Sequence, residues 1–178
     1  LDIANAHADL LYIKTDGSLD DGMELVSHPC TMDYHINEFP WEDIMHRAVR
    51  QGYRSHQTST CGLHLHVNRS AFSDNQEEQD EVISRILYFV EHHWNELLKF
   101  SRRSEYTMNR WAARYGYEHT PKAIMDKAKK GGNGRYAAVN LCNYHTVEFR
   151  LFRGTLKYNT FIATIQLVNR ICDAAMYN

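Results

Sequence analysis

The sequence lacks several features that would place it outside the ordinary globular proteins. None of its apolar runs approaches the roughly 20 residues that a membrane-spanning helix needs, and no signal peptide is visible. The 20 basic and 22 acidic side chains nearly cancel to a net charge of −2, which argues against non-specific binding to nucleic acid or membrane. We therefore expect a cytoplasmic protein with neither a nucleic-acid nor a membrane partner.

Closely spaced cysteine pairs are also missing. The four cysteines are far apart in the chain: Cys30, Cys61, Cys142 and Cys172. Because no C-x-x-C pair is present, reduced thiols are the expected state. An apolar content of 43% with 12% aromatic residues excludes disorder, and 178 residues suit one domain with a real core.

The chain begins at Leu1 rather than at a methionine and stops at Asn178 inside a helical pattern. We interpret residues 1–178 as a single domain of a longer protein. This domain would lack the N-terminal part of that protein and, in an alternative interpretation, a C-terminal part as well. The oligomeric state is left open, and an oligomer is compatible with the sequence.

Hydrophobic periodicity predicts the secondary structure. Strands are expected at residues 9–15, 23–27, 62–69, 135–141 and 146–152, and helices at residues 39–53, 77–100 and from 158 onward. Asp74 or Asn75 is expected to cap the second helix. Asp16-Gly17-Ser18 predicts a turn that connects the first two strands as a hairpin. The composition of residues 127–134 predicts a mobile basic loop. Because strands and helices mix without regular βαβ alternation, we predict an α+β fold with an antiparallel sheet backed by helices.

The segment 146–155 carries the strongest functional signal. Its alternation places Thr146, Glu148 and Arg150 on one face of a strand and apolar residues on the other. A carboxylate beside a guanidinium can hold a cation and an anionic oxygen, although an ordinary surface ion pair would look the same. Arg153 should point to the opposite face in a regular strand, but a bulge near Gly154 could redirect it.

A second predicted strand, at residues 62–69, also carries polar side chains on one face. His64 and His66 are two residues apart, so both imidazoles would lie on one face and could reach one cation or its bound phosphate. The alternative is a solvated sheet face. Gly62, just before this pair, would allow another group to approach the backbone closely.

Other candidates are weaker when taken alone. Glu24 in a short strand is usually solvent-facing. Arg102, Arg103 and Arg135 could form an anion clamp or a solvated basic surface. The lysines at positions 127, 129 and 130 are explained more simply by a solvated loop than by a loop that closes over bound phosphates.

Taken in order, several motifs resemble the amidoligase family, which belongs with glutamine synthetase to the carboxylate–amine ligase superfamily. They lie at residues 16–19, 22–27, 62–67, 101–103, 135–141 and 146–156, ending in Thr146-Val-Glu-Phe-Arg-Leu-Phe-Arg-Gly-Thr-Leu156. The resemblance covers residues 9 to 175 and implies a glutamine synthetase-like fold with a curved antiparallel sheet. It implies a reaction in which ATP phosphorylates a carboxylate and an amine then displaces phosphate to form an amide.

The resemblance also implies residue roles. Glu148, His64 and Glu24 would bind Mg²⁺, with Mn²⁺ as an alternative, and His66, Arg103 and Arg150 would bind the nucleotide. Arg150, Arg153 and Arg135 would act on the phosphoryl group or the carboxylate. The substrates would be a carboxylate and an amine, each a small molecule, a peptide or a protein side chain.

One family feature is missing from the sequence, because no strand with an E-x-E pair of metal ligands precedes Asp9. Its loss motivates an alternative, a non-catalytic binding or assembly module that keeps the fold. A zinc hydrolase that uses His64, His66 and a carboxylate is a third hypothesis, but it explains neither the arginines nor the Gly-Thr motif.

Overall fold

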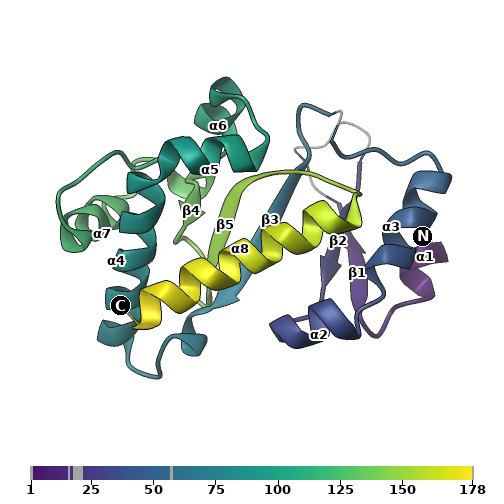
Figure 1. Cartoon of the computed structure of the whole chain (residues 1–178), viewed down its shortest axis with the longest axis horizontal. Helices are drawn as coiled ribbons and strands as arrows, with labels where there is room; N and C mark the ends of the chain where they lie inside the picture. Colours follow the sequence, from purple (N-terminus) through teal and green to yellow (C-terminus); the bar gives the residue numbers. More distant parts are fainter. Residues whose placement is uncertain (1, 16, 18–21, 57, 178) are drawn as a thin grey trace. The chain divides into compact units, whose positions relative to one another are not determined.

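The structure is a computed structural model that describes residues 2–15, 17, 22–56 and 58–177 (Figure 1). Asp16 and Ser18 of the expected turn lie outside the described residues. The chain divides into two compact units, the first comprising residues 1–61 and 154–166 and the second residues 62–153 and 167–178. No described helix is long and apolar enough to cross a bilayer. None of the four cysteines is in a disulfide, as expected.

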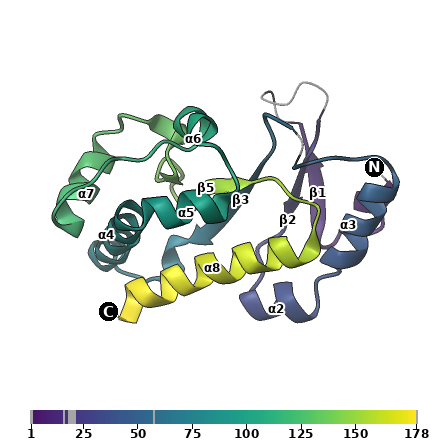
Figure 2. The same ribbon diagram turned by 45° about the horizontal axis from the view of Figure 1, so that its top comes forward.

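The first unit is built on a small antiparallel hairpin. Its elements are α1 (Asp2–Asn5), β1 (Leu11–Lys14), β2 (Glu24–Ser27), α2 (Met32–Asn37), α3 (Trp41–Arg50) and the beginning of α8 (Tyr158–Tyr177). The predicted pairing of β1 with β2 (Figure 2) is confirmed. In its register Lys14 is opposite Glu24. Trp41 of α3 stacks on Phe39 at 4.0 Å between ring centroids and contacts Phe161 of α8 at 4.7 Å. These aromatic side chains form part of the core of this unit.

The second unit contains a three-stranded antiparallel sheet in the order β3-β5-β4. Its strands are β3 (Gly62–Asn68), β4 (Val139–Asn140) and β5 (Thr146–Arg153). Its helices are α4 (Gln76–His92), α5 (Trp94–Ser101), α6 (Glu105–Trp111), α7 (Pro121–Lys129) and the end of α8, with the 3₁₀ turns η1 (Arg69–Ala71) and η2 (Gly134–Tyr136). Val147, Phe149 and Leu151 of β5 are fully buried, as their alternation predicts, and share one core with apolar residues of α4, α5, α7 and α8.

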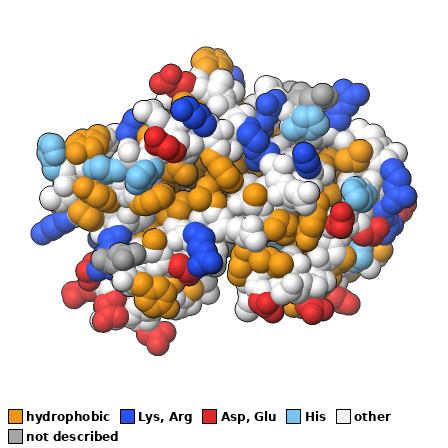
Figure 3. All heavy atoms as spheres, viewed as in Figure 1, with side chains coloured by type: hydrophobic (Ala, Val, Ile, Leu, Met, Phe, Trp, Pro, Cys, Tyr) orange, Lys and Arg blue, Asp and Glu red, His pale blue; other side chains and the backbone are white. Residues whose placement is uncertain are grey.

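Helix α4 begins with a well-formed cap. The Asn75 side chain accepts hydrogen bonds from the backbone N–H groups of Glu77 and Glu78, so Asn75 rather than Asp74 is the N-cap. Acidic side chains gather over the beginning of α4, at the lower left of Figure 3. Negative charge there interacts favourably with the positive end of the helix dipole, which stabilises the start of the helix.

Three predicted elements differ from the structure. The helix expected over residues 77–100 is interrupted at His93, whose backbone (φ −107°, ψ 27°) ends α4 and precedes α5. The strand expected over 135–141 is reduced to β4, because Tyr136 and Ala138 instead bond the backbone of Ala113. Lys127 and Lys129, expected in a loop, lie in the last turn of α7 and pair with Glu118 and Asp80.

The α+β class is confirmed. Among the described residues the strands form two small antiparallel sheets, one of two strands and one of three. The assignment of the whole chain to one domain stays a prediction.

Candidate functional site

A row of three polar residues crosses the sheet of the second unit. Glu148 on the central strand β5 is directly opposite His66 on β3 and Asn140 on β4. Residues opposite each other in adjacent strands point to the same face. The polar face of this sheet is therefore centred on Glu148, whose side chain is only 6% exposed.

A β-bulge determines which arginines join this face. Leu63 is opposite Phe152 whereas Leu65 is opposite Phe149, so Arg150 and Leu151 together oppose the single residue His64. The extra residue reverses the alternation for the rest of β5. Arg153, which pairs with Gly62, consequently points to the face of Glu148. The bulge that the sequence allowed is thus present, but opposite His64 rather than at Gly154.

The two oxygens of the Glu148 carboxylate have different partners. Oε2 accepts hydrogen bonds from the amide groups of Asn140 (2.6 Å) and Asn143 (3.3 Å). Oε1 accepts one from Nη1 of Arg150 at 2.7 Å and lies 3.3 Å from Nδ1 of His64. Burial alone would raise the pKa of Glu148, but the Asn140 hydrogen bond and the charge of Arg150 outweigh it and keep the pKa below its ordinary value.

The two histidines lie on one face, as their spacing predicted, and both approach this carboxylate oxygen. Nε2 of His66 lies 3.7 Å from Oε1 of Glu148, while its Nδ1 is 3.0 Å from the Thr146 hydroxyl. Burial and the charge of Arg150 lower the pKa of His64 to about 4, although Glu148 opposes the shift. His64 is therefore neutral near pH 7, and its contact with Glu148 is a polar contact rather than an ion pair.

Further arginines reach the same end of the sheet from the turn after α5. Nη2 of Arg103 donates to the carbonyl of Phe152 at 3.1 Å, and Nη2 of Arg102 donates to that of Arg153 at 3.4 Å. Burial, with the charges of Arg150 and Arg153, lowers the pKa of Arg103 to about 10. Several guanidinium groups are thus held close together, an arrangement that an anion would stabilise.

The backbone conformation of the turn after α5 orients the side chains of Arg102 and Arg103. Arg102 has a left-handed conformation with φ 61° and ends α5, and the buried Ser101 hydroxyl accepts the backbone N–H of Arg103 at 3.1 Å. A Cβ on Gly62 would be 2.7 Å from Nη2 of Arg103 and 2.8 Å from Nε2 of His64. The close approach expected at Gly62 is therefore present.

Two of the arginines carry buried donors that no described residue pairs with. Nε of Arg103 and Nε of Arg150 are buried and have no hydrogen-bond partner among the described residues. Buried donors are normally satisfied, so an unpaired guanidinium N–H on a polar sheet face is suited to an anionic ligand.

The remaining predicted residues are placed less centrally. Arg135 is exposed and bonds the Tyr136 hydroxyl at 2.9 Å, while the guanidinium of Arg150 lies 5.8 Å from the ring of Tyr136. Glu24 belongs to the first unit, where it is half-buried rather than solvent-facing, while its neighbour Leu25 is exposed. Glu24 is therefore not among the residues that the second unit brings together.

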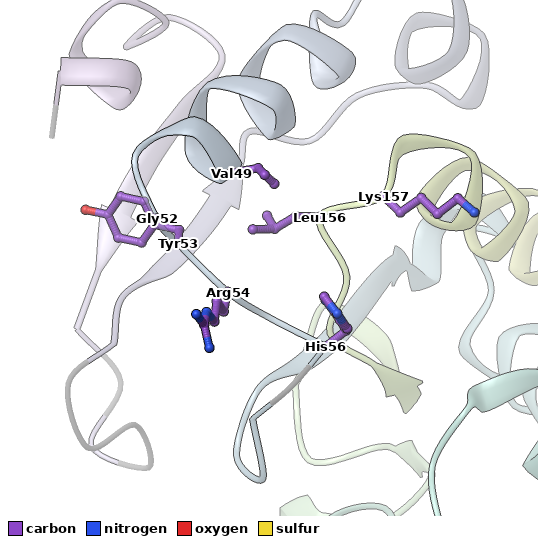
Figure 4. A pocket seen from close by; sticks show the side chains of 7 residues that line it. All are labelled: Val49, Gly52, Tyr53, Arg54, His56, Leu156 and Lys157. Atoms are coloured by element: carbon purple, nitrogen blue, oxygen red, sulfur yellow. The ribbon is translucent and has the colours of Figure 1, made fainter.

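A separate hollow lies in the first unit (Figure 4). Its volume is about 430 Å³, and the lining residues are Val49, Gly52, Tyr53, Arg54, His56, Leu156 and Lys157. It includes none of the predicted site residues. No group of three or more His, Cys, Asp or Glu side chains in the described part of the chain is arranged to hold a metal ion.

The family comparison agrees with the motifs on this sheet. Residues 7–172 match the family described as "Putative amidoligase enzyme". The chain belongs to this amidoligase family. The comparisons with curated proteins and with solved structures found no match.

Sequence reasoning missed the amide groups of the site. Asn140 and Asn143 are bonded to Glu148, and Asn140 lies within a motif, residues 135–141, that the resemblance used without giving this asparagine a role. A signal was present, because an asparagine at the end of a buried strand needs a polar partner. Its partner could not be identified without the register of β4 on β5.

Proposed function

We propose that this amidoligase-family chain is an ATP- and Mg²⁺-dependent carboxylate–amine ligase that forms an amide bond through an acyl phosphate. The observation that carries the proposal is the polar face of β3 and β5, where Glu148, His64, His66, Arg150 and Arg153 meet. The proposal includes a glutamine synthetase-like architecture, in which a curved antiparallel sheet carries nucleotide and substrates.

Each group has a task that suits its chemistry. The guanidinium groups of Arg103, Arg150 and Arg153 would bind phosphate oxygens and stabilise the transferring phosphoryl group, because positioned positive charge is most effective in a partly dehydrated site. The unpaired Nε donors of Arg103 and Arg150 support this role. His66 would contact the nucleotide phosphates and Arg135 the carboxylate or phosphoryl group. The substrates would be a carboxylate and an amine.

The fit to a divalent cation is partial. The second unit offers one carboxylate oxygen, Oε1 of Glu148, with the two imidazoles of His64 and His66 beside it. Mg²⁺ prefers oxygen ligands and Mn²⁺ accepts imidazole more readily, so the set by itself suits Mn²⁺ better. Glu24, in the first unit, is also a proposed metal ligand. A bound cation would offset the charge of the polyphosphate.

The first test is calorimetric titration of an ATP analogue into the chain, with Mg²⁺ and then with EDTA. We expect Mg²⁺-dependent binding of one nucleotide per chain and its loss in His64→Ala. Absence of binding in the wild-type chain would contradict the proposal for this chain.

Glu148→Gln tests the assignment of Glu148 as a metal ligand. Because the change removes the carboxylate charge that would bind the cation, we expect metal-dependent ATP turnover to fall by at least about 100-fold while the domain stays folded. Glu105→Gln, an exposed carboxylate on α6, is the matched control. Turnover at the wild-type rate in Glu148→Gln would disprove the assignment.

A second candidate function is a non-catalytic nucleotide-binding or assembly module. It is favoured by one observation, the lack of a ready three-ligand metal group among the described residues. Nucleotide binding without ATP turnover, in the presence of a broad set of carboxylates and amines, would support this function over the ligase.

A further inference from the structure

Asn140 is the most deeply buried polar group in contact with Glu148. It is 2% exposed, and its side-chain amide nitrogen donates to Oε2 of Glu148 at 2.6 Å. Its side-chain oxygen accepts the backbone N–H of Cys142 at 2.8 Å. This second bond fixes the amide orientation, because a reversed amide would place oxygen against carboxylate and N–H against N–H.

The strand that carries Asn140 is itself held in place. The Tyr115 hydroxyl donates to the carbonyl of Val139, the neighbouring residue of β4, at 3.0 Å. Val139 is opposite Phe149 in the register and is buried in the core. The amide of Asn140 therefore reaches Glu148 from a buried, paired strand, whereas Asn143 reaches it from the connection between β4 and β5.

The two oxygens of Glu148 are consequently unequal. Oε2 is saturated by the two asparagines, and Oε1 is the oxygen that faces Arg150, His64 and His66. We propose that Asn140 is a positioning residue that locks the Glu148 carboxylate in one orientation, so that a single oxygen serves the ligand-binding face. The inference deepens the proposed function and rests on it for the meaning of that face.

Another buried carboxylate in the same unit provides a comparison. Glu91, 3% exposed, binds Nε of Arg114 at 2.8 Å and the backbone N–H of Tyr115 at 2.6 Å. These two bonds join α4 to the segment after α6, which is the pattern of a structural carboxylate. Glu148 differs because its Oε2 is bound by two asparagine amides while its Oε1 is directed toward two imidazoles and an arginine.

A crystal structure of Asn140→Leu tests the inference without reference to activity. Leucine has the same branching at Cγ but no hydrogen-bond donor, so we expect the Glu148 carboxylate to rotate and its Oε1 to move beyond hydrogen-bond distance, about 3.5 Å, from Arg150. Asn140→Ser, whose hydroxyl is too short to reach Oε2, is expected to show the same change and serves if the leucine variant does not fold. A carboxylate that keeps its wild-type orientation in these variants would overturn the proposal.

Kinetics separate positioning from simple loss of stability. We expect either variant to lower the kcat for ATP turnover at least about tenfold while the KM for ATP changes less than about threefold. Val139→Ala is the matched control, because it removes core contacts from the same strand without touching Glu148. An equal loss of kcat in Val139→Ala would overturn the positioning role. If the wild-type chain has no ligase turnover, the proposed function fails, and the crystal structures still decide the role of Asn140.

Discussion

At the scale of single residues, burial and neighbouring charges act in opposite directions on the protonation of the groups on the polar face. Burial would neutralise Glu148, but Asn140 and Arg150 keep it ionised. Burial and Arg150 keep His64 neutral even though the carboxylate is adjacent. The sequence predicted which residue types would meet, because spacing of two along a strand fixes the face. It could not predict their protonation, which depends on burial and on neighbours from other strands.

The depressed pKa of His64 predicts a pH dependence of stability. The pKa is about 4 in the folded state against 6.5 for an ordinary histidine, so the unfolded chain binds more protons between these values. Stability must then fall as the pH falls through this window, and we expect a loss on the order of 2 kcal/mol between pH 7 and pH 5. Urea unfolding at the two pH values measures it.

The control for this effect is a pair of histidine variants. His64→Gln should flatten the pH dependence, whereas His46→Gln, at an exposed position on α3, should leave it unchanged. Glu148 contributes in the same direction but only at lower pH, because its pKa is lowered in the folded state and the unfolded chain takes up this proton only below the ordinary pKa of a glutamate. An identical slope in wild type and His64→Gln would contradict the account.

A substitution at Gly62 tests steric contact at the site rather than charge. In Gly62→Ala the new methyl would be 2.7 Å from Nη2 of Arg103 and 2.8 Å from Nε2 of His64, so both groups must move. Its backbone is outside the left-handed region, and the displaced atoms are side-chain ends, so we expect less than about 1 kcal/mol of destabilisation. We expect the affinity for an ATP analogue to fall by about tenfold, measured by calorimetry.

Gly132→Ala is the matched control for that substitution, because a Cβ at Gly132 meets no atom of the described residues within 4 Å. Unchanged nucleotide affinity in Gly62→Ala would show that the placement of Arg103 and His64 does not matter for binding.

At the scale of elements, β5 shows where prediction from sequence succeeds and where it stops. The alternation of Val147, Glu148 and Phe149 is sufficient to assign the two faces of the strand. The bulge at Arg150 and Leu151 cannot be read from β5 alone, because it is a mismatch of register with β3. The reassignment of Arg153 to the polar face therefore required the pairing of residues about 90 positions apart.

The start of α4 provides an element-scale test of stability. Asn75→Ala removes the acceptor for the N–H groups of Glu77 and Glu78, and we expect it to cost about 1 kcal/mol in the free energy of unfolding. Asp74→Ala, one residue earlier, should change it by less than about 0.5 kcal/mol. Chemical denaturation of both variants decides between the two caps that the sequence allowed, and a larger loss in Asp74→Ala would reverse the assignment.

At the scale of the whole molecule, sequence patterns identified the α+β class but not the division of the chain into two compact units. The β1–β2 hairpin, the helical stripe of α8 and the separate strands β3 and β5 follow from local periodicity. The division into two compact units follows from long-range packing, which no local pattern contains. Helix α8 belongs to both, since Phe161 and Ile165 are buried in the first unit and Val168 and Cys172 in the second.

This sharing predicts that a break in α8 affects both units. Gln166 is exposed in the middle of α8, and a proline there removes a helical hydrogen bond and clashes with the preceding turn, at a cost of about 3 kcal/mol. Gln166→Ala keeps the helix and is the control. Hydrogen exchange should show lower amide protection in Gln166→Pro in the β1–β2 ladder and also in the β3–β5 ladder. Loss of protection in only one ladder would mean that the other unit keeps its fold without an intact α8.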